Sequence, residues 1–357
     1  MDFKYEIEKG EDSKIDIKIT IPKEEFEKEK NSQFKKLSKD VSLPGFRPGK
    51  GPKDLVEAKI GSRLYDEVME ALIPEATLSV IKEKNWRILT NVNYDIKKFD
   101  PETGIEFTAT IYVFPEFKLP SFSKIKVKKD SNEVTKEELE TYMLNFAKDI
   151  EMREGKKTED FSLEKIDDKW VADRKIPNVK TKKELEEFLK KFLEQEKLRV
   201  VEDKYMNDIL EKSADMAKID VPKILVEIEI EIREEENKIR LKELGIEWEN
   251  WEKQQGEKLE ENKKLERENI QKGYKIQFLL MKVGEEADIK VDDEVVKASL
   301  KAPQNKTMVE RLGEETVETN LRNQIYQQQV IAWVKKQVEG DKKEEQKSQK
   351  DSKKDEK

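Results

Sequence analysis

The residues best suited to binding another molecule lie in one loop. It comprises Gly45, Phe46, Arg47, Pro48, Gly49, Lys50, Gly51 and Pro52. The segment 41–53 holds three glycines and three prolines, which interrupt helices and strands, so the sequence predicts a turn-rich loop. Its cations are Arg47, Lys50 and Lys53, a local reversal of sign in a chain of net charge −8. Arg47 can bind a carboxylate or phosphate through two hydrogen bonds, and Phe46 can fill a small apolar pocket. Taken alone, the loop fits a plain helix–helix connector equally well.

The chain contains neither histidine nor cysteine. It therefore offers no imidazole base, no thiol nucleophile and no usual zinc ligand set, and catalysis would depend on carboxylates, Lys or Tyr alone. No GxxxxGK[ST] phosphate-binding loop occurs, which argues against a nucleotide cycle. The sequence disfavours an enzyme and predicts no catalytic residue, no metal site and no cofactor.

The N-terminal residues MDFKYEIEKG lack a basic region followed by an apolar run. No apolar stretch approaches the ~18 residues of a membrane span. These features predict a soluble, cytoplasmic protein without a membrane partner. Because the net charge is −8, binding to nucleic acid would require a local basic patch such as the loop.

Length and composition predict at least two units with thin cores. The chain has 357 residues, and single cores stop growing beyond ~250–300 residues. Charged residues make up 43% and hydrophobic residues 35%, yet the aromatic residues indicate packing. Thin, elongated and largely helical elements fit this balance better than a single globule.

Local patterns predict an α+β domain over residues 1–115. Ile15, Ile17, Ile19 and Ile21 alternate, which is typical of a strand with one buried face, and a strand at 3–7 can pair with it. Sparse helical spacing follows from residue 23. A helical pattern covers 54–84, with Pro74 marking a kink or a new first turn, and further strands are expected at 86–99 and 105–114.

The remainder predicts an extended linker at 116–134 and a helical domain at 135–340. Thr135 with Glu138, and Thr181 with Glu184, have the spacing of capping boxes that open helices. The run of isoleucines in 224–232 suits a strand or a helix, and Pro222 before it favours a helix. More helices are expected at 257–286, 292–300 and 314–338. The highly charged tail 341–357 is predicted to be disordered.

Several segments together resemble the trigger factor family of ribosome-associated bacterial chaperones. They are GFRPGKGP at 45–52 with Leu55, Val56, Ile60 and Gly61 after it, ALIPEA at 71–76, PEF at 115–117, IDVP at 219–222 and IKVDDEV at 289–295. The resemblance covers nearly the whole chain.

The resemblance implies an α+β ribosome-binding domain, followed by an elongated, mainly α-helical chaperone domain with arm-like extensions. It further implies an ATP-independent chaperone whose partners are the large ribosomal subunit, through an exit-site protein and rRNA, and nascent or unfolded polypeptides. The ribosome-binding residues would be Gly45, Phe46, Arg47, Pro48, Gly49 and Lys50. The position after Arg47 is often basic in the family and is Pro48 here. Self-association as a homodimer stays open.

The resemblance also implies that one domain of the family is absent from this chain. The family usually carries a prolyl isomerase domain of the FK506-binding type between the positions of Glu151 and Asp167, where this chain has only about fifteen residues, too few for a domain of ~50 or more. A form without isomerase activity is expected. The alternatives are a prolyl isomerase-type folding enzyme and a helical scaffold that does not bind ribosomes.

Overall fold

The computed structural model describes residues 1–47, 50–256 and 258–352, with side chains up to residue 340. The chain divides into two compact units. The first comprises Met1–Lys118 and Lys218–Phe278, and the second comprises Leu119–Ala217 and the residues from Leu279 on. Among the described helices, none combines the length and apolar character that a membrane span requires.

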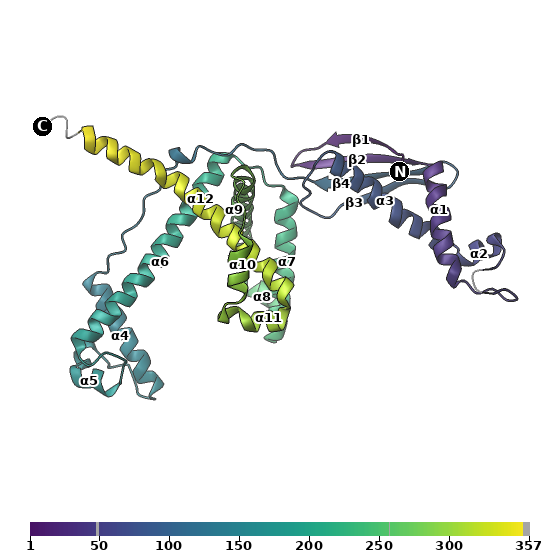
Figure 1. Cartoon of the computed structure of the whole chain (residues 1–357). Helices are drawn as coiled ribbons and strands as arrows, with labels where there is room; N and C mark the ends of the chain where they lie inside the picture. The colour runs from purple at the N-terminus through teal and green to yellow at the C-terminus, as the bar shows by residue number, and fades with distance from the viewer. Residues whose placement is uncertain (48–49, 257, 353–357) are drawn as a thin grey trace. The chain divides into compact units, whose positions relative to one another are not determined.

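A four-stranded antiparallel sheet forms the N-terminal part of the first unit, in the order β1-β2-β4-β3 (Figure 1). The strands are β1 (Lys4–Lys9), β2 (Lys14–Pro22), β3 (Asn93–Asp100) and β4 (Gly104–Tyr112). The central strands pair from Lys14 opposite Tyr112 to Pro22 opposite Gly104. The four alternating isoleucines of β2 are all buried, so the predicted half-buried strand is confirmed.

Helices α1 and α3 cover one face of this sheet (Figure 1). The helices here are α1 (Lys23–Leu37), α2 (Lys53–Ile60) and α3 (Arg63–Glu83). The sequence predicted one helical segment over 54–84, whereas the structure has two, because Gly61, with a φ of 65°, ends α2. Pro74 lies inside α3 and does not open a new helix.

The strand predicted over 86–99 begins only at Asn93. Ile88 forms an isolated bridge with Val113, and the amide of Leu89 donates to the carbonyl of Tyr112 at 2.8 Å. Regular pairing starts with Asn93 opposite Thr110. The intervening residues are irregular, in keeping with their imperfect alternation, and lie beside the end of β4.

Gly104 is the position in the sheet where a side chain would cost most. Its φ is 108°, and a Cβ atom there would lie 2.1 Å from the carbonyl oxygen of Ile21. We expect Gly104→Ala to lower the free energy of unfolding of the first unit by about 2 kcal/mol, because the backbone is strained and β2 must move. Urea denaturation measures the change. The control is Gly10→Ala, whose Cβ would lie 3.5 Å from Lys14, and equal losses in both variants would contradict the argument.

Three further helices belong wholly or partly to the first unit: α7 (Lys223–Glu243), α8 (Trp248–Gln255) and α9 (Lys258–Glu286), the last up to Phe278. The helical interpretation of residues 224–232 is confirmed. A carboxylate oxygen of Asp12, in the hairpin between β1 and β2, accepts a hydrogen bond from the amide of Lys223 at 2.8 Å. It serves as the cap of α7, because Pro222 at the N-cap supplies no side-chain acceptor.

This grouping differs from the predicted domain boundaries of 115 and 135–340. Residues 218–278 pack with the N-terminal residues, in part because the rings of Phe114 and Phe278 meet with centroids 5.1 Å apart. No local pattern reveals a contact between positions so distant in the sequence.

The second unit has a small core around α4 (Lys136–Arg153), α5 (Asp168–Asp173) and α6 (Lys182–Ala217). Both predicted capping boxes are present, with reciprocal hydrogen bonds between Thr135 and Glu138 and between Thr181 and Glu184. The fully or largely buried side chains are Met143, Ala147, Ile166, Trp170, Val171, Val179, Leu185 and Leu189. The segment between α4 and α6 is therefore part of a packed core.

A buried carboxylate joins the helices of this core. The indole of Trp170 donates to Glu151 at 2.7 Å, the guanidinium of Arg174 is bonded to the same oxygen, and Lys156 lies 3.2 Å from the other oxygen. The side chain of Glu151 is only 7% exposed. One acidic residue thus holds the end of α4 to α5.

The predicted linker 116–134 is extended, and from Leu119 on it packs within the second unit. The ring of Phe122 meets that of Trp333 edge to face, and Asp130 pairs with Lys204 at 2.6 Å. Burial of Phe122, Ile125 and Val127 explains why this segment is not a free linker.

The second unit also contains α10 (Asp293–Leu300), α11 (Lys306–Leu312) and α12 (Glu314–Ser352). Short 3₁₀ turns occur in both units, at Ser38–Asp40, Phe122–Lys124, Leu163–Lys165 and Pro303–Asn305. The backbone of α12 continues into the tail 341–357 that was predicted to be disordered. The Lys, Glu and Gln residues of that tail have high helix propensity. Residues 353–357 lie outside the described residues.

Candidate functional site

The candidate site is the loop that leads from α1, through the turn Ser38–Asp40, to α2 (Figure 1). The amide of Phe46 donates to the carbonyl of Leu43 at 3.1 Å, and the amide of Lys50 donates to the carbonyl of Arg47 at 2.9 Å. Gly45 has a φ of 81°, which glycine tolerates best. The predicted turn-rich loop is confirmed for its described residues, whereas Pro48 and Gly49 lie outside them.

The base of the loop is closed by an apolar contact. A Cβ atom on Gly51 would lie 2.6 Å from the side chain of Leu43 and 3.2 Å from that of Val56. Val56, on α2, is 2% exposed. Leu43 therefore folds back over Gly51, where a Cβ atom would have to displace the end of the Leu43 side chain. The tip is held on a packed base.

The side chains at the tip face solvent. Phe46 is 45% exposed, and Leu55 on α2 is 53% exposed. Arg47 and Lys50 are also exposed, and the described residues provide neither with an ion-pair partner. The loop thus presents one aromatic ring and two cations that can bind another molecule.

The third predicted cation of the loop has a different role. The ammonium group of Lys53 lies 3.2 Å from the side-chain oxygen of Asn31 and 5.6 Å from the ring centre of Phe34, both on α1. Lys53 therefore braces α2 against α1, a contact that its position in the sequence does not reveal.

An ion pair also links α1 and α2. The ammonium group of Lys30 lies 2.7 Å from Glu57 and 5.3 Å from the ring centre of Tyr65. Burial disfavours the charged form of Lys30, but the hydrogen bond to Glu57 and its negative charge outweigh that effect, so the pKa of Lys30 is raised. Helices α1, α2 and α3 are joined beneath the loop.

Three exposed lysines precede the loop and were not among the predicted site residues. Lys35 and Lys36 lie in the last turn of α1, and Lys39 lies in the following turn. The sequence signal that could have indicated a binding role for these lysines is their clustering at the end of a helical pattern. The same clustering also occurs on ordinary helix faces that contact only water. They add positive charge beside the loop.

Two sequence profiles match the chain. One, described as bacterial trigger factor protein, matches residues 3–145, and the other, described as the C-terminus of the same protein, matches residues 181–336. The chain belongs to the trigger factor family. Residues 146–180 lie between the two matches and contain α5, the turn Leu163–Lys165 and parts of the small core, so the trigger factor form seen here lacks the isomerase domain.

Individual trigger factors support this assignment. The chain is 28% identical to the trigger factor of Corynebacterium aurimucosum over 165 residues, which is 45% of this chain but only 37% of the relative's length. It is 25% identical to the trigger factor of Bacillus pumilus over 385 residues, covering 84% of this chain and 90% of the relative.

A solved trigger factor chaperone, described for promiscuous substrate recognition in folding and assembly, matches the fold. The TM-score is 0.55 at 18% identity, and the match covers 93% of this chain and all of the other. An N-terminal sheet domain followed by a largely helical region is thus the fold of this trigger factor. Among the described residues, no group of three or more acidic side chains is arranged to hold a metal ion.

Proposed function

We propose that this protein is an ATP-independent chaperone of the cytoplasm that docks on the large ribosomal subunit near the nascent-chain exit and shields emerging unfolded polypeptides. Family membership supports the chaperone role. The observation that carries the docking proposal is the pair of exposed side chains, Phe46 and Arg47, on a loop whose base is packed.

Docking would use the two side chains in different ways. The guanidinium of Arg47 pairs with an acidic side chain of an exit-site protein or with an rRNA phosphate, and the ring of Phe46 enters an apolar pocket. Lys53 contacts α1 at the base of the loop, so Arg47 and Lys50 are the cations at the tip itself. The loop would then contribute a salt slope of about −2, as expected for weak and reversible docking.

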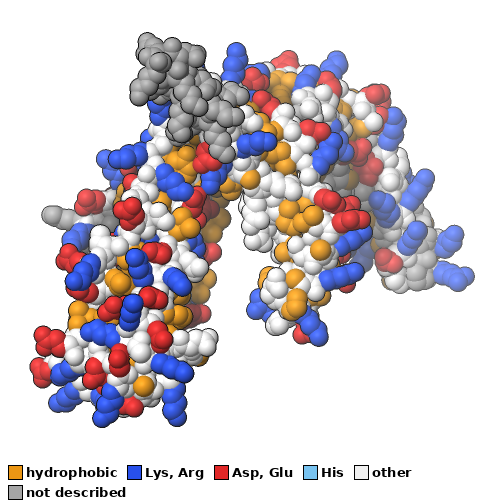
Figure 2. All heavy atoms as spheres, turned by 60° about the vertical axis from the view of Figure 1, so that its left-hand side comes forward, with side chains coloured by type: hydrophobic (Ala, Val, Ile, Leu, Met, Phe, Trp, Pro, Cys, Tyr) orange, Lys and Arg blue, Asp and Glu red, His pale blue; other side chains and the backbone are white. Residues whose placement is uncertain are grey.

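Shielding requires apolar surface that remains accessible. Figure 2 shows apolar side chains interspersed with Lys, Arg, Asp and Glu on the visible face. The larger exposed apolar side chains of the two units include Phe188, Phe192, Ile232, Ile239 and Leu244. Apolar groups separated by charges can hold an unfolded chain while keeping the chaperone itself soluble.

Ribosome co-sedimentation tests the docking proposal. We expect Phe46→Ala combined with Arg47→Ala to weaken binding to large subunits by at least about tenfold, because an aromatic anchor and a bidentate cation are lost together. The matched control is Phe188→Ala with Arg199→Ala, an exposed pair on α6, which should bind as the unaltered protein does. Unchanged co-sedimentation of the loop variant at low and moderate salt would show that the loop is not the anchor.

A further inference from the structure

A groove of about 590 Å³ lies within the second unit, between α4 and the first half of α6. The α6 residues that line it follow one another at three and four positions, which keeps them on one side of the helix; they are Leu193, Glu196, Lys197 and Val200. On the α4 side the groove is lined by the ring of Tyr142, among others. The buried core around α4, α5 and α6 holds the two helices together, so the groove has fixed walls.

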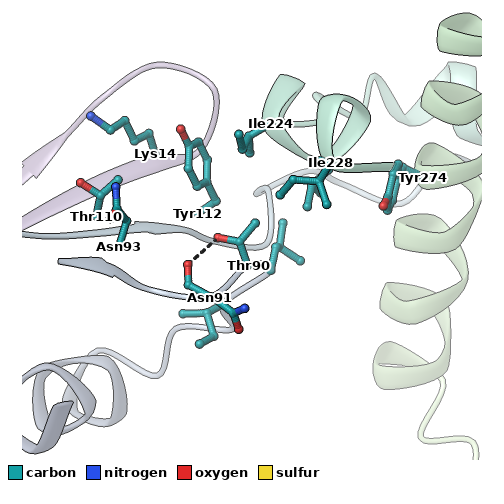
Figure 3. A pocket seen from close by; sticks show the side chains of 12 residues that line it. Lys14, Thr90, Asn91, Asn93, Thr110, Tyr112, Ile224, Ile228 and Tyr274 are labelled. Carbon is teal, nitrogen blue, oxygen red and sulfur yellow. Dashed lines mark hydrogen bonds between the residues drawn. The ribbon is translucent and has the colours of Figure 1, made fainter. Parts of the chain in front are cut away.

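The larger cavity of the first unit, shown in Figure 3, differs from this groove in charge. Its volume is about 850 Å³, and Lys14, the one charged residue among its described lining residues, is paired with Asp16 at 2.8 Å. Three carboxylates and one ammonium group line the groove. The charge of a ligand would therefore matter more in the groove than in the cavity.

The one cation that lines the groove, Lys197, is fully engaged by the protein itself. Its ammonium group donates to the carbonyl oxygen of Glu133 at 2.6 Å and to the two carboxylate oxygens of Glu138 at 2.8 and 2.9 Å. The hydrogen bond from Lys197 is also the largest cause of the lowered pKa of Glu138, so this carboxyl keeps its charge and its partner. The pair contributes no net charge to the groove.

Two further carboxylates give the groove its negative charge. Among the described residues, no cation lies within ion-pair distance of Glu137, and Glu196 is paired with the 71% exposed Arg199 at 3.9 Å. Burial, and after it the negative charge of Glu196, raises the pKa of Tyr142. Because Glu137 belongs to α4 and Glu196 to α6, a cation that enters the groove is attracted from both walls.

Apolar groups accompany these carboxylates. The ring of Tyr142 stacks on that of Phe192, with centroids 6.2 Å apart and an interplanar angle of 21°. Leu193 is half-buried, and Val200 is 59% exposed. An aromatic face attracts a cation, and the methylene groups of a long basic side chain pack on aliphatic surface.

The combination excludes most kinds of ligand. An anion would be repelled, and a purely aliphatic segment would remove water from the two carboxylates without replacing it. No described group of three acidic side chains is arranged to hold a metal ion. An organic cation on an apolar stem satisfies both the carboxylates and the rings. The guanidinium of arginine fits best, because its five donors can bond two carboxylates while its plane stacks on a ring.

The groove is longer than one arginine side chain. Along α4 it extends from Thr135 to Asn145, which is about 15 Å of helix. An extended segment of about five residues covers that distance. The ligand is therefore a segment of a protein, with room for aliphatic residues on either side of the arginine.

We propose that the groove between α4 and α6 binds a short basic motif of a partner protein, an arginine flanked by aliphatic residues. The guanidinium bonds to Glu137 and Glu196 and lies on the ring of Tyr142, and the aliphatic residues pack against Leu193 and Val200. Recognition depends on the charge and the side chains of the motif and does not require the partner to be unfolded. The inference goes beyond the proposed function, because it involves neither the loop nor the general shielding of unfolded chains.

Isothermal titration calorimetry of the full chain with a capped pentapeptide, Leu-Ala-Arg-Ala-Leu, tests the proposal. The first comparison peptide carries citrulline in place of arginine, which keeps the shape and removes the charge. The second carries serine in place of both leucines. We expect the arginine peptide to bind at least about tenfold more tightly than either, with an affinity that falls as salt rises.

Protein variants locate the binding surface. Glu137→Gln with Glu196→Gln should weaken the arginine peptide by at least about tenfold and abolish its advantage over the citrulline peptide. The matched control is Glu187→Gln with Glu194→Gln, which removes the same charge from a part of α6 that does not line the groove and should leave binding unchanged. Hydrogen exchange of residues 136–189 should be the same in both variants, because the altered side chains lie outside the buried core.

The loop variant Phe46→Ala, Arg47→Ala should bind the arginine peptide as the unaltered protein does, since the loop belongs to the other unit. This result separates the groove from the proposed ribosome docking, and lost peptide binding in the loop variant would contradict it. Three further results would overturn the proposal. They are equal affinity for the arginine and citrulline peptides, equal affinity for a free polyamine, and displacement of the arginine peptide by an unfolded chain that contains no basic residue. Self-association of the protein that disappears in Glu137→Gln, Glu196→Gln would instead make a second copy the occupant.

Discussion

A Glu151→Ala variant is expected to lose about 3–5 kcal/mol of stability in the second unit, the range for removing one partner of a buried ion pair. The carboxylate bonds to the indole of Trp170 and to Arg174, whose side chain is 11% exposed. Without Glu151, the guanidinium of Arg174 would keep a buried charge, and its remaining acidic partner among the described residues would be Glu154, at 3.3 Å from its Nε. Because each 1.4 kcal/mol is a factor of ten, this loss would raise the population of the locally unfolded second unit by about 10²–10³-fold.

The same carboxylate makes this stability depend on pH. Burial by itself would raise the pKa of Glu151, but hydrogen bonds from Trp170, Lys156 and Arg174 outweigh burial and lower the pKa below its ordinary value of 4.5. A carboxyl whose pKa is lower in the folded state stabilises the fold above the unfolded pKa. That contribution is lost as the pH falls through the folded pKa. The stability difference between the unaltered protein and Glu151→Gln should therefore be full at neutral pH and shrink below about pH 4.5.

Hydrogen exchange of peptides from residues 136–189 measures this effect in the unit concerned. The control is Glu140→Gln, on the same helix, whose side chain is 46% exposed and pairs with Lys136 at 3.6 Å. An exposed pair of this kind contributes less than about 1 kcal/mol. Equal exchange in the Glu151 and Glu140 variants, or a Glu151→Gln loss that does not vary with pH, would refute the proposed role of the buried carboxylate.

The loop and most elements were predictable because their signals are local. Three glycines and three prolines in 41–53 predict turns whatever the tertiary structure, and strict alternation in β2 and the capping-box spacing of Thr135 with Glu138 work in the same way. The exposure of Phe46 and Arg47 agrees with a presented tip. Their binding to ribosomes stays a prediction.

What the sequence did not reveal depends on contacts between distant positions. In the sequence, Lys53 cannot be distinguished from the other cations of the loop, and only the structure shows its contact with Asn31. In the same way, Glu151 cannot be distinguished from the other acidic residues of a charged helix, and only the structure shows its contact with Trp170 on α5. The contact of Asp12 with Lys223 joins residues that are 211 positions apart. In a chain where 43% of residues are charged, nothing in the composition singles out the few charges that are buried or act as caps.

The aromatic residue beneath the loop differs from the aromatic residue at its tip. Phe26 is fully buried on α1, and its ring lies 6.2 Å from that of Tyr65 on α3 and 5.5 Å from that of Phe99 on β3. This cluster ties α1 to the sheet and to α3. Because α1 leads directly into the loop, the position of the loop depends on Phe26 even though Phe26 contacts no partner.

Phe26→Ala is accordingly expected to destabilise the N-terminal part of the first unit by about 3–5 kcal/mol, through lost burial and the cavity left behind. Urea denaturation and hydrogen exchange over residues 1–115 measure the loss, with Phe188→Ala, a 46% exposed site on α6, as the control. The Phe26→Ala variant should lose ribosome docking only at temperatures where α1 and α3 lose their protection from hydrogen exchange. The Phe46→Ala, Arg47→Ala variant should lose docking at every temperature while that protection stays intact. Lost docking of Phe26→Ala with native protection would instead mean that Phe26 acts on the ribosome other than by holding α1 in place.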